Sequence, residues 1–133
     1  MLADAALLIV RILDKAQLRD YLALAREELK LATLVEVHGE KELEAALDAK
    51  APIIGINNRD LDSFKVSLET TARLRALLPA GVVSVSESGI STREDVALLG
   101  TMQVDAALIG EELVKAADPA ARIRELLGRT HAG

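Results

Sequence analysis

The stretch IIGINNRDL, residues 53–61, changes character within one residue. It begins as an apolar run rich in isoleucine and continues, after Ile56, as two amides, a guanidinium and a carboxylate. An apolar run without alternation is typical of a parallel strand that is covered on both faces. The stretch therefore predicts a buried parallel strand whose carboxyl end carries a cluster of hydrogen-bonding groups.

Similar apolar runs recur roughly every 20 to 30 residues on both sides of this stretch. The five strand candidates are ALLIV (6–10), ATLVEV (32–37), PIIGI (52–56), VVSVS (82–86) and AALIG (106–110). Helical apolar stripes lie between them, formed by Leu18, Leu22, Ala25 and Leu29, then by Leu43, Ala46 and Leu47, then by Leu74, Leu77 and Leu78. We expect each stripe to pack on the sheet, so the chain is a series of βα units.

Helix boundaries support the same division. The third helix should stop before Pro79, and Ser91 with Glu94 forms a capping-box pattern at the start of the fourth. Asp118 followed by Pro119 predicts an N-cap and the first residue of a last helix. Five βα units in residues 1–133 are expected to form a single domain.

Repeated βα units build either an open doubly wound sheet or a (βα)8 barrel. The first strand is followed by VRILDKAQL, which lacks the glycines of a dinucleotide-binding turn, and the sequence has no P-loop. Glycines instead follow the last two strands, at Gly89 and Gly110, where a barrel places its phosphate-binding loops. The expected fold is α/β, a partial TIM (βα)8 barrel with five parallel βα units.

Composition excludes several classes of function. A net charge of -5, with 16 basic and 21 acidic residues intermixed, argues against a nucleic-acid or membrane partner and favours a small-molecule substrate. The sequence has no cysteine, so disulfides and thiolate zinc sites are excluded, and the cytoplasm is the expected location. We read no targeting signal in the first residues. The two histidines, His38 and His131, are far apart, and no metal-ligand spacing is recognised.

Polar residues close four of the strand candidates. They are Glu36 and His38 after the second, Asn57, Asn58, Arg59 and Asp60 after the third, Glu87 and Ser88 after the fourth, and Gly110 after the fifth. One such cluster alone is common in ordinary turns. Because the carboxyl ends of barrel strands face a common mouth, four clusters at the same end predict a shared binding site.

Several of these side chains have two possible interpretations. A carboxylate at the end of an apolar strand, as at Glu36 and Glu87, suits a general acid or base, although a structural ion pair would also satisfy it. Arg59 is either a clamp for an anionic group or a surface ion-pair partner. His38 is either functional or an ordinary side chain that lies at a helix start or faces solvent. Three late arginines are expected on a solvated helix face: Arg122, Arg124 and Arg129.

At LVEVH (34–38), IIGINNRDL (53–61), SESGIST (86–92) and LIGEELV (108–114), the sequence resembles indole-3-glycerol phosphate synthase of tryptophan biosynthesis. The resemblance covers essentially the whole chain but only the C-terminal part of the family, from its fourth to its eighth βα unit. It implies a carboxy-lyase that closes the indole ring of 1-(2-carboxyphenylamino)-1-deoxyribulose 5-phosphate with loss of carbon dioxide and water. No cofactor and no metal are implied.

The resemblance also implies roles for the residues at the barrel mouth. Glu36 matches a glutamate implicated in acid/base chemistry, and Asn57 matches an asparagine that orients the substrate. Glu87 is the third catalytic candidate. Arg59 matches an arginine that organises the neighbouring loop and contacts substrate.

The substrate phosphate is expected at two loops. Ser88 and Gly89 match one of them, and the backbone amides of Gly110 and Glu111 match the other. Many members of the family carry a small hydroxyl residue where this chain has Glu111, so its carboxylate is expected to turn away from the anion.

The family's K-x-S-P-S signature and its third-strand lysine, the proposed general acid, have no counterpart in residues 1–133. We therefore expect a chain that binds phosphate but has little or no turnover alone. Its open strand edges are expected to be covered by self-association or by a separate N-terminal barrel segment. Two alternatives stay open: a non-catalytic phosphate-binding module, and a related barrel such as phosphoribosylanthranilate isomerase.

Overall fold

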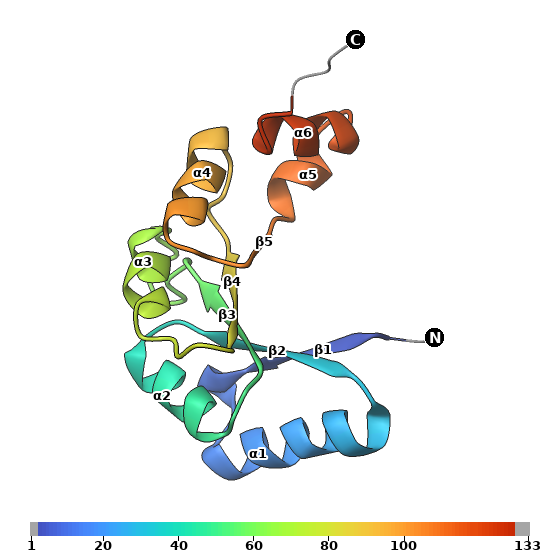
Figure 1. Ribbon diagram of the computed structural model, residues 1–133, viewed down its shortest axis with the longest axis vertical. Helices are drawn as coiled ribbons and strands as arrows, with labels where there is room; N and C mark the ends of the chain where they lie inside the picture. Colours follow the sequence, from blue (N-terminus) through green and yellow to red (C-terminus); the bar gives the residue numbers. More distant parts are fainter. Residues whose placement is uncertain (1–2, 130–133) are drawn as a thin grey trace.

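The computed structural model describes residues 3–129 and contains one five-stranded parallel sheet (Figure 1). Its strands are β1 (Ala5–Ile9), β2 (Ala32–Val37), β3 (Ile53–Asn57), β4 (Val83–Glu87) and β5 (Ala106–Leu108). Each strand pairs with the next one along the chain, in the order β1-β2-β3-β4-β5. A doubly wound sheet reverses its strand order at a switch point, whereas a barrel wall does not. The predicted partial barrel of five parallel βα units is confirmed.

The helices follow the expected alternation with the strands. They are α1 (Lys15–Ala23), α2 (Glu40–Asp48), α3 (Glu69–Arg75), α4 (Arg93–Thr101), α5 (Glu111–Lys115) and α6 (Pro119–Leu126), with a 3-10 turn at Val10–Ile12 and a π-helical segment at Leu24–Leu29. The predicted cap at Asp118 is confirmed, since its side chain accepts a hydrogen bond from the Ala121 amide. The short helix α5 was not expected from the sequence, and Gly110 caps it instead of ending a strand.

Three details of the helices differ from expectation. The capping box of α4 pairs Thr92 with Asp95, one residue later than predicted, because the Asp95 carboxylate accepts from the backbone amides of both Ser91 and Thr92. Leu29 is exposed, since the wider π-helical turn after α1 rotates it off the buried stripe. Leu77 is exposed because α3 ends at Arg75, before the predicted stripe is complete.

The hydrophobic core lies between the sheet and the helices on its convex side. Residues of β2 and β3 that point outward meet apolar residues of α1, α2 and α3; the buried set includes Val35, Val37, Ile54, Ile56, Leu18, Leu22, Leu43 and Leu74. The strand β4 contributes polar groups to the same layer. Ser84 and Ser86 are fully buried there, and each is hydrogen-bonded, Ser84 to Asp105 and Ser86 to Asn58. The outer layer is thus apolar at β2 and β3 and polar at β4.

The concave side of the sheet has no covering helix among the described residues (Figure 1). Strand pairing places Leu7, Leu34, Val83 and Leu108 on this face, and three of them are strongly exposed: Leu7 at 50%, Val83 at 42% and Leu108 at 53%. An eight-stranded barrel fills this space with side chains from the opposite wall. The inner face is therefore open at Leu7, Val83 and Leu108, whereas Glu36 and Glu87 on the same face are buried.

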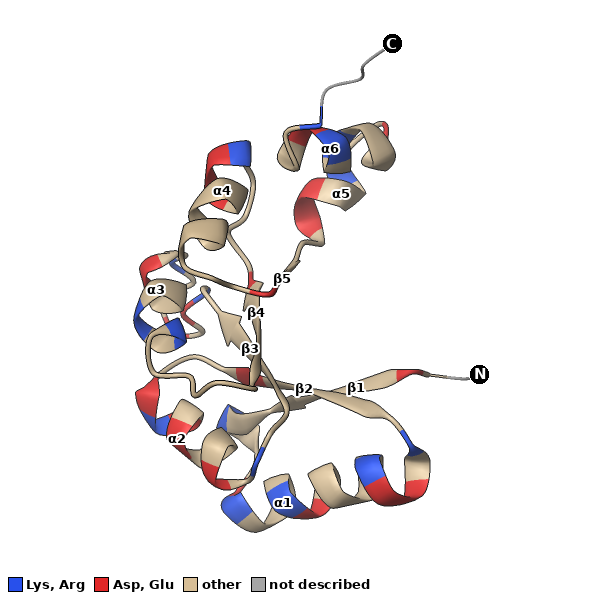
Figure 2. Ribbon diagram, in the orientation of Figure 1, with Lys and Arg blue, Asp and Glu red and all other residues tan. Residues whose placement is uncertain are grey.

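Charged residues lie mainly on the outer helices, where both signs are intermixed (Figure 2). This distribution matches the sequence, in which acidic and basic residues are intermixed without a basic run. Within residues 3–129, no helix combines the length and the apolar character needed to cross a membrane.

Candidate functional site

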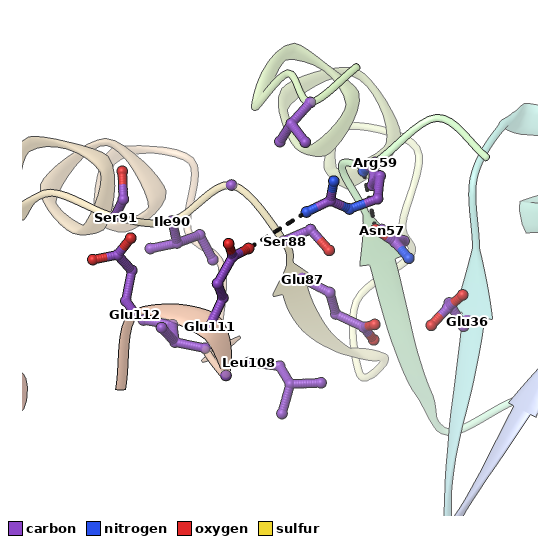
Figure 3. Close-up of a pocket in the computed structure, with 14 residues that line it drawn as sticks. Glu36, Asn57, Arg59, Glu87, Ser88, Ile90, Ser91, Leu108, Glu111 and Glu112 are labelled. Carbon is purple, nitrogen blue, oxygen red and sulfur yellow. Dashed lines mark hydrogen bonds and ion pairs between the residues drawn. The ribbon is translucent and has the colours of Figure 1, made fainter. Parts of the chain in front are cut away.

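A pocket of about 700 Å³ lies at the carboxyl ends of β2, β3, β4 and β5 (Figure 3). The structure brings together in its lining the eight residues to which the sequence assigned a catalytic or substrate-binding role: Glu36, Asn57, Arg59, Glu87, Ser88, Gly89, Gly110 and Glu111. Val66, Ile90 and Leu108 supply apolar wall. His38, Asn58 and Asp60 are not among the residues that line the pocket. The carboxyl ends of separate strands thus converge on one hollow, as parallel strands of a barrel do.

Two buried carboxyl groups face each other across the middle of β3. Glu36 pairs in register with Gly55 on the neighbouring strand, and Glu87 lies on the strand beyond. Gly55 makes this arrangement possible, because a Cβ at that position would overlap the Glu87 carboxyl oxygen Oε1. The absence of one side chain in a β-branched strand therefore creates the space that the Glu87 carboxyl group occupies.

The environment of Glu87 favours its neutral form. Burial is the larger cause and the neighbouring Glu36 the second, and together they raise the pKa of Glu87 to about 8, from an ordinary value of 4.5. Glu87 Oε1 is buried and has no hydrogen-bond partner within residues 3–129. At neutral pH the site therefore contains a carboxylic acid that can donate a proton next to a second carboxyl group.

His38 lies directly behind Glu36. Its side chain is only 8% exposed, with Nε2 3.2 Å from Glu36 Oε1 and Nδ1 3.1 Å from Glu42 Oε2. The alternative of a solvent-facing His38 is therefore wrong, whereas its place two residues before α2 agrees with the alternative of a helix-start side chain.

A buried polar network holds the loop that follows β4. The Asn58 carboxamide donates from Nδ2 to Ser86 Oγ at 2.9 Å and to the Ser88 carbonyl oxygen at 3.0 Å. Its Oδ1 accepts from the amide and the hydroxyl of Thr71, at 3.2 and 2.8 Å. Ser88 and Gly89 both have left-handed backbone, with φ of 68° and 72°. Asn58 thus anchors the turn in which these two residues sit.

The Asn57 and Arg59 side chains extend from β3 toward the pocket (Figure 3). Asn57 Oδ1 accepts a hydrogen bond from the Arg59 amide at 3.0 Å. The Arg59 guanidinium lies 3.7 Å from Glu111 Oε2, and Glu111 Oε1 accepts from Lys115 at 2.6 Å. In this structure the Glu111 carboxylate reaches across the pocket instead of turning away from it. Glu111 therefore occupies part of the space available to an anion.

One of the three late arginines departs from expectation. Arg122 is not on a solvated face: its guanidinium contacts the carboxylates of Glu112 and Glu125, at 2.9 and 2.8 Å, and donates to the Ser91 carbonyl oxygen. These contacts tie α6 to α5 and to the loop after β4. The last helix thus supports two loops of the pocket.

Sequence reasoning missed several residues that shape this site. Gly55 was detectable, because a glycine inside an otherwise β-branched strand indicates a close approach at that point. Glu42 gave no such signal, since its contact with His38 depends on how α2 begins. Asn58 was named among the polar residues after the third strand, but its anchoring role was not predicted, since its partners are set by the register of the sheet and by loop geometry. Within residues 3–129, no group of three or more histidine, cysteine, aspartate or glutamate side chains is arranged to hold a metal ion.

The family comparison agrees with the geometry. A family model described as indole-3-glycerol phosphate synthase matches residues 1–126. An indole-3-glycerol phosphate synthase of Roseiflexus sp. is 55% identical over 128 residues, covering 95% of this chain and 47% of the relative. One from Chlorobium phaeobacteroides is 58% identical over 111 residues, covering 84% of this chain and 43% of the relative. The chain thus spans about half the length of the curated relatives it matches.

Solved structures confirm the type of fold. Thiamine phosphate pyrophosphorylase from Pyrococcus furiosus superposes with a TM-score of 0.72 at 16% identity, covering 96% of this chain and 59% of that one. DHODH from Eimeria tenella superposes with a TM-score of 0.67 at 12% identity, covering 96% and 49%. At these identities the likeness concerns the fold alone. On the extent and identity of the sequence match, this chain belongs to the indole-3-glycerol phosphate synthase family.

Proposed function

We propose that this chain supplies the phosphate-binding and carboxyl-bearing part of an indole-3-glycerol phosphate synthase active site. The reaction is ring closure of 1-(2-carboxyphenylamino)-1-deoxyribulose 5-phosphate, with loss of carbon dioxide and water. The observation that carries the proposal is the convergence of Glu36, Asn57 and Glu87 with two phosphate-type loops around one pocket. In this proposal residues 1–133 form one domain, the C-terminal five-eighths of the barrel.

The three polar side chains from β2, β3 and β4 have complementary roles in the proposal. Glu36 acts as the base or acid nearest the reacting ring carbons, and Asn57 orients the substrate. Glu87, held neutral by burial, is suited to donate a proton to an oxygen that leaves as water. Arg59 is suited to pair with the substrate's carboxylate once Glu111 releases it.

The phosphate is assigned to the loops after β4 and β5. The left-handed turn at Ser88 and Gly89 brings backbone groups toward the pocket, and Gly110 and Glu111 border it from the other side. Support comes from the lack of a side chain at Gly89, where a Cβ would overlap Val66 Cγ1. Only the backbone N–H of Glu111 is assigned a phosphate contact, since its carboxylate would repel the anion.

The pocket-lining residues of the described chain include no lysine. Protonation of the ketone oxygen during ring closure is therefore assigned to a lysine in the part of the barrel that the curated relatives contain and this chain does not match. General acid catalysis contributes typically ~10²- to 10⁴-fold in rate. We infer that the 133-residue chain alone turns over little or no substrate.

The open inner face supports an association partner. Exposed Leu7, Val83 and Leu108 lie where the remaining barrel wall would pack. We infer that an N-terminal barrel segment or a second copy of the chain covers this face. The absence of cysteine favours a reducing compartment, and we infer the cytoplasm.

The test is turnover followed by the fluorescence of the indole product. The chain is assayed alone and mixed with the segment of the Roseiflexus relative that precedes the match, with the Glu36→Gln chain in the same mixture as control. Activity that appears only on mixing, and is lost with Glu36→Gln, supports the proposal. Activity of the unmixed chain would overturn the assignment of the acid. A mixture that associates and binds substrate but stays inactive would favour a non-catalytic phosphate-binding module, which the open inner face also supports.

A further inference from the structure

His38 lies between two carboxyl groups that come from different elements. Glu36 belongs to β2 and faces the pocket, whereas Glu42 lies in the first turn of α2 and is 22% exposed. The imidazole spans the distance between them, with Nε2 3.2 Å from Glu36 Oε1 and Nδ1 3.1 Å from Glu42 Oε2. The three side chains thus form a continuous row from the pocket to the surface.

Glu42 determines which ring nitrogen of His38 carries hydrogen. Its Oε2 accepts a hydrogen bond from the His38 backbone amide at 2.8 Å and also contacts Nδ1. A carboxylate oxygen that already accepts from an amide has no hydrogen to give, so Nδ1 must be the donor. The neutral imidazole therefore carries its lone pair on Nε2, on the side of Glu36.

A lone pair on Nε2 facing a carboxyl oxygen at 3.2 Å is favourable only if a proton lies between them. Nε2 is buried, and its contact with Glu36 Oε1 does not have the geometry of a hydrogen bond; within the described chain Nε2 makes no hydrogen bond with any group. In an unliganded site such a bond is often poorly aligned and tightens when substrate binds. We propose that His38 is the proton partner of Glu36: its Nε2 and Glu36 Oε1 share one proton, with the imidazole held in the Nδ1–H form by Glu42.

The transfer balances in protons and charge. When Glu36 holds the proton, the row consists of a neutral acid, a neutral imidazole and the Glu42 carboxylate. Breaking the Glu36 O–H bond and forming an Nε2–H bond gives a carboxylate, an imidazolium and a carboxylate. The net charge is -1 in both states, so only one proton moves, and the Glu42 carboxylate stabilises the imidazolium. Glu36 can thus return to its carboxylate form without passing its proton to the substrate; this step rests on the proposed function.

His38 acts through Glu36 and is therefore a positioning residue in this proposal. The charged groups around the row are Glu36 from β2, Glu42 from α2 and, beyond Glu36, Glu87 from β4. Arg11 adds positive charge near Glu42. Within the described residues, the ion-pair contacts of the imidazole are those with Glu36 and Glu42.

The test observes the imidazole nitrogens directly, by long-range ¹H–¹⁵N spectroscopy of the labelled chain at pH 7. His131 is the second histidine of the sequence, and His131→Gln assigns the signals. We expect Nδ1 in its protonated form and Nε2 at a shift between the protonated and unprotonated limits. Glu36→Gln should move Nε2 to the unprotonated limit, because the amide donates to the lone pair.

Two further variants separate the roles of the flanking groups. Glu42→Ala should release Nδ1 and give a mixture of tautomers, whereas Glu44→Ala, an exposed glutamate of the same helix, should leave both signals unchanged. A wild-type chain with Nε2 protonated and Nδ1 unprotonated would overturn the proposal. His38 nitrogen signals that do not change in Glu36→Gln would also overturn the proposal.

A kinetic measurement adds a readout that a purely structural role would not give. In a complemented barrel that turns over, His38→Gln should lower kcat at least about tenfold with KM unchanged. Equal changes in kcat and KM would contradict the proton-partner role. Because the nitrogen shifts need no turnover, they decide the role of His38 even if the proposed reaction fails.

Discussion

Substitution of Asn58 by alanine should be among the most damaging single changes in this chain. The side chain is 2% exposed and makes four hydrogen bonds of 2.8 to 3.2 Å, two through Nδ2 and two through Oδ1. Its partners come from two segments: Thr71 from α3, and Ser86 and the Ser88 carbonyl from the end of β4. Alanine keeps the backbone bonds of residue 58 and removes all four side-chain bonds.

The loss of free energy of unfolding depends on the hydrogen-bonding groups that Asn58→Ala leaves without a partner. Each hydrogen bond contributes about 1 kcal/mol net, and a buried group left unpaired costs about 1 to 3 kcal/mol. The Thr71 and Ser86 hydroxyls can still bond to each other, at 2.7 Å, which spares part of the loss. We therefore expect Asn58→Ala to lower the free energy of unfolding by about 4 kcal/mol, a large share of the 5 to 15 kcal/mol typical of a domain.

The assay is urea unfolding followed by circular dichroism, at one protein concentration for all variants. With a slope of about 2 kcal/mol per M, the midpoint should fall by about 2 M urea. Asn57→Ala is the matched control, since its Oδ1 accepts one hydrogen bond and its loss should cost about 1 kcal/mol or less. The losses in free energy of unfolding caused by Thr71→Val and by Asn58→Ala should be non-additive in the double variant, by at least about 1 kcal/mol. Equal effects of Asn57→Ala and Asn58→Ala would refute the reasoning.

Three further outcomes test the site. Burial raises the pKa of Glu87 from 4.5 to about 8, so the free energy of unfolding should be highest below pH 4.5 and should fall as pH rises through about 8, by at most about 1.4 kcal/mol per pH unit. Glu87→Gln should remove this pH dependence in urea titrations, and an unchanged dependence would assign it to other groups. Gly89→Ala should weaken the binding of inorganic phosphate at least about tenfold in calorimetry, since φ of Gly89 is 72° and the new Cβ would overlap Val66. The control Gly100→Ala has open space around it and should leave the affinity unchanged. Equal phosphate affinities of the two variants would exclude the Ser88–Gly89 turn from the phosphate site. Glu36→Ala should reduce turnover of a complemented barrel by about 10²-fold or more while phosphate affinity is retained, and equal loss of both would contradict the division of roles.

The alternation of strands and helices was predictable because it depends on local patterns. Two strands are encoded by their own β-branched runs, at 32–37 and 53–56, and the start of α6 is encoded by Asp118 and Pro119. The capping box of α4 was placed one residue too early because Ser91 and Thr92 are both good caps. Only the position of Asp95 relative to their amides decides between them.

The convergence of the polar residues was also predictable, since parallel strands direct their carboxyl ends to one side. Their mutual contacts were not. The approach of Glu87 to Glu36 depends on the register of β2, β3 and β4 and on the missing side chain at Gly55. The burial of His38 depends on where α2 begins, and the LVEVH sequence alone does not predict that position.

The open inner face and the protonation of the site are physically linked. Desolvation is the main cause of the raised pKa of Glu87, and Leu108, its partner in the register with β5, is 53% exposed on the same face. Covering this face removes water from the surroundings of both carboxyl groups. Less water strengthens the preference of Glu87 for its neutral form and strengthens the electrostatic interactions that remain around it. The association proposed above would therefore raise the pKa of Glu87 further, so that covering the inner face and keeping the proton on Glu87 would depend on the same contact.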